Sequence, residues 1–402
     1  MTLLHGRKGQ GPILAPPFDE REAERCLLAW VNAGTFCAML AATKDSCRER
    51  NVDSVDFDAL ELAARAQMPP ASFAFCTAGA DDEISMAENV AAWRGMRLRP
   101  RMLRDVTAID TRVTLLGQQV PTPIMVAPTG RHKLFHPLGE RATARGAAAA
   151  GAAYVMACYS NILLEDVAEE RRDAPQWFQL YYWPKRDEVE ALIGRVVEAG
   201  FTGLVLTVDA PVVGWSPRAA REQHEPTPDV LNINMPGRLP ARTFYHPDFV
   251  GRVIYPATWR ELEWLVKRSP IPVIVKGVLR GDDALACAEH GARAIIVSNH
   301  GGRHLDTTVT TVAALGEVVQ AVGDKAEVYV DGGIRRGADI LKALALGARA
   351  VLVGRPIIWG LAVNGADGVT SVLDHLHVEL VRAMQLSGTA TLADATPDLL
   401  AC

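Results

Sequence analysis

The sequence predicts a (β/α)8 barrel, the TIM barrel fold, with an N-terminal helical extension and a long loop after the fourth strand. From Thr122 onward, short apolar segments rich in β-branched residues alternate with stretches of helical periodicity. This order is typical of parallel strands joined by crossover helices. Eight such segments are present, and eight strands favour a closed barrel. A doubly wound open sheet is the alternative that this order leaves open.

The strands and helices can be placed from the length and flanking residues of each segment. We expect strands at residues 124–127, 154–157, 177–181, 204–208, 273–276, 294–297, 328–330 and 350–353. Between them, helical periodicity predicts helices at residues 140–150, 187–199, 259–267, 282–290, 311–321 and 336–346. Most of the connections are short, as they are in α/β folds.

Residues 1–110 precede the barrel and are predicted to form a helical extension packed on it, while residues 111–402 form the barrel. The clearest amphipathic helices of the extension lie at 58–66 and 82–93. Within the barrel, the segment at about 210–255 contains seven prolines and has no clear period. Long segments of this kind inside compact domains are often functional. We therefore predict that this loop is a mobile cover over an active site.

The composition is that of an ordinary globular protein. The 402 residues carry a formal net charge of -5, and Lys and Arg are scattered along the chain, so we expect no nucleic-acid partner. The seven cysteines are odd in number and lack CxxC spacing. This pattern predicts reduced thiols in a cytoplasmic protein, with no disulfide framework and no metal site.

Residues 26–43 carry no charge and approach the length that a membrane span requires. The segment contains Asn32, Gly34 and Thr35, and it lacks the basic start and the cleavage site of a signal peptide. We predict a buried helix pair, and membrane anchorage is the alternative.

Polar residues follow the predicted strands at the points where those strands end. The carboxyl ends of barrel strands meet at one mouth, where such enzymes place their catalytic groups. The residues concerned are Gln179, Tyr181, Thr207, Asp209, Lys276, His300, Arg303 and Asp331. Five separate strands therefore contribute to one site.

Two of these residues are unusual for a strand end. Lys276 closes an apolar strand, where its charge needs a negative partner. That partner is either a side chain in a structural ion pair or an anionic cofactor. His300 lies in Ser298-Asn299-His300-Gly301-Gly302-Arg303, where a titratable base stands three residues from a fixed cation. A histidine in a glycine-rich turn can also serve only as a hydrogen-bond partner of the backbone.

Two glycine-containing loops predict a phosphate site. Residues 331–337, DGGIRRG, follow strand seven, and residues 354–356, GRP, follow strand eight. Barrels place phosphate groups at these two loops, where backbone amides approach the anion and arginines neutralise it. Neither a P-loop nor a GxGxxG motif follows a strand. A phosphorylated cofactor is therefore expected in the barrel.

These motifs resemble those of the FMN-dependent α-hydroxy-acid oxidases and dehydrogenases, a family that includes glycolate oxidase, lactate oxidase, lactate monooxygenase and mandelate dehydrogenase. The resemblance runs from about Phe73 to Thr389. Its most specific pieces, in chain order, are PIMVAPT at 123–129, QLY at 179–181, LTVD at 206–209, VKGV at 275–278, SNHGGR at 298–303 and DGGIRRG at 331–337.

The resemblance implies FMN as the cofactor and a 2-hydroxy acid as the substrate. It implies that His300 is the base, that Asp209 orients and stabilises it, and that Lys276 stabilises charge on the flavin. Tyr181 and Arg303 would bind the substrate oxygen and carboxylate. The residues implied to bind the cofactor are Pro128, Thr129, Gly130, Gln179, Thr207, Lys276, Ser298, Asp331, Gly332, Gly333, Arg335, Gly354 and Arg355.

Some of the residues that the resemblance would place at the substrate differ from those usual in the family. Phe75 stands where the family usually has a tyrosine, and Ser216 stands where it usually has a second arginine. A lost hydrogen bond to a charged group costs a few kcal/mol, so glycolate and lactate should bind poorly unless Arg218 compensates. Gly130 replaces a common alanine and is expected to add room above the flavin. We predict a larger substrate, such as an aryl or long-chain 2-hydroxy acid.

The reaction partners are expected from the same resemblance. The segments around Trp215 and Tyr182 are similar to the lactate monooxygenase branch, which favours O2 as the electron acceptor over another acceptor. No heme-binding module precedes the barrel. The alternative function is oxidation or oxidative deamination of a biosynthetic intermediate that lacks a simple free carboxylate, and a degenerate non-catalytic barrel is a third hypothesis. The family resemblance also implies a homotetramer.

Overall fold

The computed structural model describes residues 55–171, 174–222, 232–235 and 256–401. The chain divides into two compact units, residues 1–51 and residues 52–402, and all described residues belong to the second. The uncharged segment at 26–43 lies outside the described residues. Within the described ranges, no helix is both long enough and apolar enough to cross a membrane.

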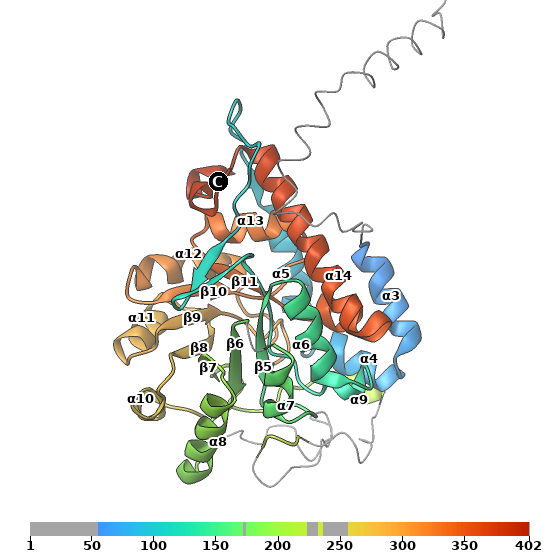
Figure 1. The fold of residues 1–402 in the computed structure, drawn as a ribbon, viewed down its shortest axis with the longest axis vertical. Helices are drawn as coiled ribbons and strands as arrows, with labels where there is room; N and C mark the ends of the chain where they lie inside the picture. Colours follow the sequence, from blue (N-terminus) through green and yellow to red (C-terminus); the bar gives the residue numbers. More distant parts are fainter. Residues whose placement is uncertain (1–54, 172–173, 223–231, 236–255, 402) are drawn as a thin grey trace, which may run out of the picture. The chain divides into compact units, whose positions relative to one another are not determined.

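Eight parallel strands close into a barrel, as the sequence predicts (Figure 1). Each strand pairs with its neighbours in chain order, and the last pairs with the first. The strands are β4 (Ile124–Val126), β5 (Ala153–Ala157), β6 (Gln176–Leu180), β7 (Gly203–Thr207), β8 (Val273–Val278), β9 (Ala294–Val297), β10 (Glu327–Val330) and β11 (Ala350–Val353). The open-sheet alternative is excluded by this closure.

Helices follow each strand and surround the barrel (Figure 1). Their bounds are α6 (Gly139–Ala149), α7 (Leu164–Glu169), α8 (Arg186–Glu198), α10 (Trp259–Arg268), α11 (Gly281–Glu289), α12 (Thr311–Val322), α13 (Gly337–Ala345) and α14 (Arg355–Ser387). Local sequence explains their starts. Helix α10, for example, begins with a capping box in which Thr258 and Glu261 satisfy each other's backbone amides. Helix α14 is interrupted at Asn364 and Gly365, whose dihedral angles are not helical.

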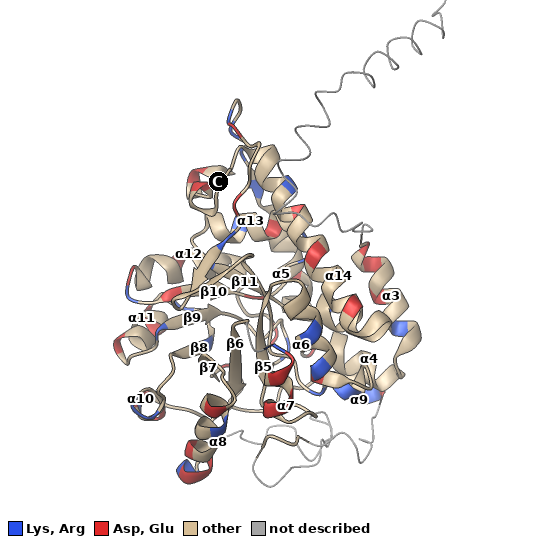
Figure 2. Cartoon of the chain, in the orientation of Figure 1, with Lys and Arg blue, Asp and Glu red and all other residues tan. Residues whose placement is uncertain are grey.

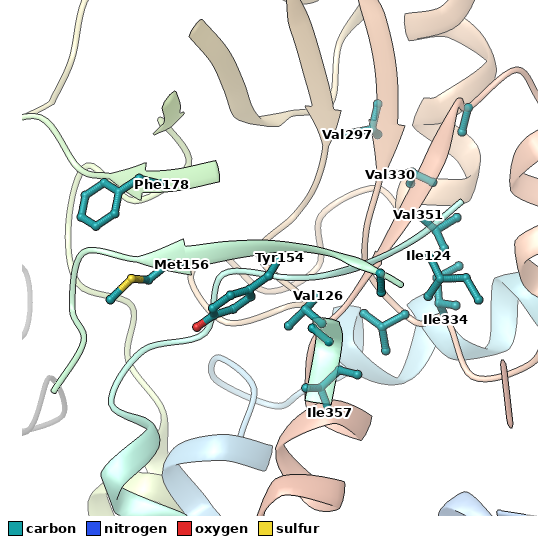
Figure 3. Close-up of a cluster of buried hydrophobic side chains, with 14 of the residues drawn as sticks. Ile124, Val126, Tyr154, Met156, Phe178, Val297, Val330, Ile334, Val351 and Ile357 are labelled. Atoms are coloured by element: carbon teal, nitrogen blue, oxygen red, sulfur yellow. The ribbon is translucent and has the colours of Figure 1, made fainter. Parts of the chain in front are cut away.

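The strands pack apolar side chains on both faces, because side chains alternate along a strand and both faces of a barrel strand are covered. Residues of one face form the barrel interior, including Met125, Val155 and Ile296. The short hairpin of β2 (Val113–Leu115) and β3 (Gln118–Val120) adds to this interior cluster. Residues of the other face pack under the helices (Figure 3), among them Ile124, Val126, Tyr154, Met156, Phe178, Val297, Val330 and Val351, together with Ile334 and Ile357.

Charged residues are concentrated outside the barrel strands. Both signs occur on the surrounding helices (Figure 2). Lys276 in β8 and Glu327 at the start of β10 are the only charged residues in the eight described barrel strands. Lys276 is 4% exposed, so the strand that carries it places a cation inside the protein at the end where the predicted site lies.

Three helices precede the barrel in the described part of the chain: α3 (Phe57–Gln67), α4 (Pro70–Thr77) and α5 (Ile84–Gly95). Helix α3 packs on α14 (Figure 1). Helix α5 is tied to the loop after β9, because Asp306 accepts hydrogen bonds from the amides of Asp82, Ile84 and Ser85. Helix α4 was not predicted, since its short sequence shows no amphipathic period.

Part of the predicted active-site cover can be described. Its first residues lead into the short helix α9 (Pro217–Arg221), which Ser216 caps by accepting a hydrogen bond from the amide of Ala219. Residues 223–231 and 236–255 of this loop lie outside the described residues. The prediction that the loop is a mobile cover therefore stays a prediction.

Candidate active site

A cavity opens at the carboxyl ends of the barrel strands. Many of the residues predicted from the sequence line it: Phe75, Pro128, Thr129, Gly130, Lys276, His300, Arg303, Asp331, Gly332, Gly333, Arg335, Gly354 and Arg355. Loops that are far apart in the sequence thus meet around one space.

His300 and Asp209 form a hydrogen-bonded pair at this mouth. The Nδ1 atom of His300 lies 2.8 Å from Oδ1 of Asp209, and the amide of His300 donates to Oγ of Ser298 at 3.0 Å. His300 adopts a left-handed backbone conformation, with a φ of 57°, in the turn after β9. Such backbone strain is common at functional sites. Hydrogen bonds therefore hold both the ring and the backbone of His300 in place.

The charge of Asp209 sets the protonation of this pair. Burial alone would raise the pKa of Asp209, but His300 and Lys276 outweigh burial and lower this pKa to about 2. An ionised carboxylate only accepts hydrogen bonds, so Nδ1 of His300 carries the proton of this hydrogen bond and Nε2 is the ring nitrogen that can act as a base when the imidazole is neutral. The hydroxyl of Tyr181 lies 3.5 Å from Nε2.

Glycine at position 277 allows Asp209 to reach this place. Gly277 has a φ of +108°, and a Cβ built there would lie 2.5 Å from Cγ of Asp209. The β8–β9 register also shifts between Lys276 and Val278. A side chain at this position would displace the carboxylate that orients the base.

Lys276 extends between two polar partners inside the cavity wall. Its Nζ donates to Oγ of Ser298 at 2.8 Å and lies 3.1 Å from Oδ2 of Asp331. Burial would lower the pKa of Lys276, but the carboxylates of Asp331 and Asp209 outweigh it and raise the pKa. The structural ion pair is therefore present, and the ammonium also lines the cavity, while its contact with an anionic cofactor stays a prediction.

Two arginines place positive charge at another part of the cavity wall. Arg335 donates to the carbonyl of Ile334 at 2.9 Å and lies 5.2 Å from the ring centroid of Trp359. Burial lowers the pKa of its guanidinium to about 10. Arg355 donates to the carbonyl of Gly301 at 3.0 Å. Two half-buried cations on the wall of one cavity are suited to a phosphate group.

The glycine loop next to these arginines can approach a ligand closely. Gly332 and Gly333 have φ values of +89° and +83°, and a Cβ at Gly333 would lie 2.4 Å from the carbonyl oxygen of Asn89. Only glycine is compatible with both the conformation and the packing. The cavity therefore combines a buried ammonium, two guanidinium groups and a glycine loop, a donor set that fits FMN.

Several predicted residues lie outside the cavity lining. Gln179 and Thr207 are buried and bond to each other, with Nε2 of Gln179 donating to Oγ1 of Thr207 at 3.0 Å. Ser298 and Asp209 contact Lys276 and His300, as described above, and the hydroxyl of Tyr181 contacts His300 on its Nε2 side.

Arg218 does not compensate for Ser216 in this structure. Its Nε donates to Oε1 of Glu83 at 2.8 Å, and its terminal nitrogens donate to the hydroxyl and carbonyl of Thr77, both at 3.0 Å. Ser216 is fully buried at the start of α9. The prediction that placed Arg218 in the substrate site is corrected, because these partners already hold the guanidinium away from the cavity lining.

The reason expected for Gly130 is also corrected. Gly130 lines the cavity, but a Cβ there would lie 2.8 Å from the carbonyl oxygen of Tyr159. An alanine would thus collide with the neighbouring loop. Glycine at this position is explained by backbone packing against Tyr159 rather than by room above the flavin.

Arg303 lines the cavity with its guanidinium held at the end of α4. Its Nη1 donates to the carbonyls of Cys76 and Ala78 at 3.2 and 2.9 Å, and its Nη2 donates to the carbonyl of Phe75 at 2.9 Å. The carbonyls at a helix C-terminus carry partial negative charge. This helix therefore orients the cation that was predicted to bind the substrate carboxylate.

Sequence reasoning missed several residues that shape the site. Phe135 and Ile358 line the cavity, and the ring of His304 lies 4.2 Å from that of His300 in an edge-to-face arrangement. His304 also accepts a hydrogen bond from the amide of Gly214 at 3.2 Å. The signal available for His304 was its position four residues after His300, next to a predicted site residue.

Glu140 is another buried group that the sequence did not indicate. Its Oε1 accepts hydrogen bonds from the amides of His132 and Asn161, which lie in the loops after β4 and β5. Burial raises the pKa of Glu140 from 4.5 to about 7. Because the folded protein keeps a proton that the unfolded chain releases, this group should make stability fall as the pH rises from about 4.5 to 7.

We expect Glu140→Gln to remove this pH dependence, because the amide oxygen can still accept both hydrogen bonds and carries no charge. The stability of the wild type relative to the variant should fall by about 3 kcal/mol across that window, at roughly 1.4 kcal/mol for each pKa unit. Urea unfolding at pH 5 and pH 7.5 measures the difference. Glu170→Gln, at a surface ion pair with Arg145, is the control. Parallel pH profiles for wild type and Glu140→Gln would contradict the expectation.

The geometry can now be compared with known proteins. Residues 64–402 match the family model described as FMN-dependent dehydrogenase. The chain belongs to this family. FMN is therefore its cofactor, in agreement with the donor set of the cavity, and its reaction is the FMN-dependent oxidation of the CH–OH group of a 2-hydroxy acid.

Individual relatives cover most of this chain. An L-lactate oxidase from Nostoc sp. is 44% identical over 85% of this chain and 96% of the relative. The 2-hydroxyacid oxidase 2 of Rattus norvegicus is 42% identical over 84% and 95%. A solved structure of mandelate oxidase with (S)-4-hydroxymandelic acid is 39% identical, covers 86% of this chain and 98% of that chain, and superimposes with a TM-score of 0.81.

Proposed function

We propose that this protein oxidises aryl or long-chain 2-hydroxy acids, larger than glycolate or lactate, to the 2-oxo acids, with O2 as the electron acceptor. The observation that carries the proposal is an aromatic pair on the cavity wall. Phe75 and Phe135 both line the cavity, and their rings stack with centroids 6.3 Å apart. Apolar rings at this place favour a substrate that carries an aromatic or long apolar group.

The polar groups around the aromatic pair support the same substrate class. Neither Arg218 nor Ser216 contributes to the cavity lining, whereas Arg303 lines it beside Phe75, with its guanidinium carbon 5.6 Å from the ring centroid. A small acid offers the site only its carboxylate and its hydroxyl group for binding. An aryl acid gains further free energy by burying its ring, at roughly 25 cal/mol per Å² of apolar surface.

Residues of this chain accept the proton that leaves the substrate and hold the substrate in place. Nε2 of His300 takes a proton from the bound hydroxy acid, and Asp209 stabilises the resulting imidazolium through the 2.8 Å contact at Nδ1. Tyr181 donates a hydrogen bond to the substrate oxygen, and Arg303 binds the carboxylate. When bound, FMN supplies the acceptor for the two electrons that leave the substrate. Lys276 provides a fixed positive charge next to it.

The choice of O2 is supported by similarity to proteins that are named oxidases. The relatives from Nostoc sp. and Rattus norvegicus, and the solved mandelate oxidase, all carry that name. Hydrogen peroxide formed in step with the 2-oxo acid would support O2 as the acceptor. Turnover that requires an added dye would contradict it.

A substrate panel tests the proposed specificity. We expect (S)-mandelate and 2-hydroxyoctanoate to reduce the bound flavin with kcat/KM values at least about tenfold above those of lactate and glycolate, a factor equal to roughly 1.4 kcal/mol. The measurement is anaerobic flavin reduction by stopped-flow absorbance. Fast reduction by L-lactate or glycolate with a low KM would overturn the proposal. Ammonia release from a 2-amino acid would favour oxidative deamination instead.

The variant Phe75→Tyr tests whether this residue of the cavity wall determines the substrate specificity. A hydroxyl on this ring adds a hydrogen-bond donor to the cavity and should lower the KM for lactate by about three- to tenfold, the value of one net hydrogen bond. The KM for mandelate should change less. Phe73→Tyr, on the same helix but outside the cavity lining, is the matched control. An equal effect of both variants would count against the assignment of Phe75.

A further inference from the structure

His132 connects the cofactor cavity to helix α6 through both of its ring nitrogens. It begins the short 3-10 helix η1 (His132–Leu134) in the loop after β4, and it is fully buried. Its Nε2 lies 2.7 Å from Oγ1 of Thr129, and its Nδ1 lies 2.8 Å from Oγ1 of Thr143. Thr129 lines the cavity, while Thr143 lies inside α6.

The far end of this connection is buried in helix α6. Thr143 and Glu140 belong to the same helix and are both fully buried. Glu140 accepts a hydrogen bond from the backbone amide of His132 at 3.0 Å. Helix α6 therefore holds both the backbone and the ring of His132, and the ring in turn contacts Thr129. A packed helix is a suitable support for a binding-site residue.

The ring is neutral, which fixes the kind of hydrogen bonds that it makes. Burial lowers the pKa of His132 to about 3. A neutral imidazole has one donor nitrogen and one acceptor nitrogen. Each threonine hydroxyl therefore meets a partner of the opposite kind, and the hydroxyl of Thr129 is held in one orientation at the cavity wall.

We propose that His132 is a positioning residue for FMN, which holds the side chain of Thr129 against α6 so that the loop Pro128-Thr129-Gly130 keeps its shape at the cofactor. The proposal rests on the assignment of the cavity to FMN, but not on the substrate. None of the sequence motifs includes His132. If His132 positions Thr129 for FMN, loss of its hydrogen bond to Thr129 should weaken FMN binding more than loss of its hydrogen bond to Thr143. If His132 only stabilises the fold, loss of either hydrogen bond should have the same effect on FMN.

Two conservative variants of His132 distinguish the hydrogen bond to Thr129 from the hydrogen bond to Thr143. In His132→Gln the side-chain amide reaches about as far as Nε2 and can still bond Thr129, whereas in His132→Asn it reaches only about as far as Nδ1 and can bond Thr143. Each variant keeps one of the two hydrogen bonds, so both should lose similar thermal stability. We expect His132→Asn to release FMN about three- to tenfold faster and His132→Gln to stay close to the wild type.

The measurement is FMN release from the purified holoenzyme, followed by flavin fluorescence after dilution, with the melting temperature of each variant as the structural readout. A double-mutant cycle with Thr129→Val completes it. The effect of His132→Asn should disappear in the Thr129→Val background, because the contact is already lost there. Equal acceleration of release by His132→Asn and His132→Gln, or an undiminished effect in that background, would overturn the proposal.

A second pair of variants keeps the test decisive if His132→Asn does not fold. Thr129→Val removes the hydroxyl and should accelerate FMN release, while Thr129→Ser keeps the hydroxyl and should release FMN more slowly than Thr129→Val. Thr143→Val should change the melting temperature more than the release rate. Identical release from Thr129→Val and Thr129→Ser would contradict the proposal. A failure of the substrate panel would leave these results unaffected, since FMN release requires no substrate.

Discussion

His300→Ala should keep FMN bound and lose most substrate-driven flavin reduction. A positioned general base contributes about 10²- to 10⁴-fold to a rate, and the rate constant of reduction should fall by a factor in this range. The reason is structural, because Nε2 of His300 is the ring nitrogen that can act as a base, and Asp209 holds the other ring nitrogen at 2.8 Å. Anaerobic stopped-flow reduction by (S)-mandelate measures the effect.

The control for this variant is a histidine of similar chemistry outside the cavity. His290 ends α11 and stacks on Trp259, with ring centroids 5.0 Å apart, so His290→Ala should reduce its flavin at the wild-type rate. Asp209→Asn leaves the imidazole in place but removes the charge that stabilises its protonated form. Asp209→Asn should therefore lose part of the rate of flavin reduction that His300→Ala loses. Reduction in His300→Ala at a rate near the wild type would remove His300 from its role.

Lys276→Met should affect both stability and flavin reduction. The ammonium lies 3.1 Å from Asp331, and the two side chains are only 5% and 10% exposed. Removal of one partner of a buried ion pair leaves an uncompensated charge and costs about 3–5 kcal/mol. Flavin reduction should also slow, because the fixed positive charge in the cavity wall is lost. Urea unfolding and stopped-flow reduction measure the two effects.

A second substitution separates the two effects of Lys276. In the double variant Lys276→Met, Asp331→Asn, the buried carboxylate is neutral, so much of the stability should return. Flavin reduction should stay slow, because the positive charge is still absent. If the double variant recovers both properties together, Lys276 acts only as the partner of Asp331.

The strands of the barrel could be predicted from the sequence because their physical signal is local. Each strand is a short apolar run that is covered on both faces, such as Ala294–Val297, and polar residues end it. The same local signal placed Lys276 and His300 at the mouth, since residues at and after the carboxyl end of a barrel strand lie at the catalytic end. The family motifs then identified the cofactor.

Other features depend on contacts between distant segments, and no local pattern contains them. The sequence left open whether Arg218 compensates for Ser216, because its partners Glu83 and Thr77 lie more than 130 positions away in the sequence. The reason for Gly130 is the backbone of Tyr159 on the next loop. His132 is similar, because its role depends on a helix that packs beside it only in the folded barrel.

The central claim is that FMN binds between Lys276 and the His300–Asp209 pair, and a crystal structure of the holoenzyme with a bound 2-hydroxy acid tests it most directly. We expect the ammonium of Lys276 within hydrogen-bonding distance of the flavin ring, and Nε2 of His300 within hydrogen-bonding distance of the substrate. A flavin bound elsewhere, or a ring out of reach of Lys276 with His300 turned away from the substrate, would contradict the account.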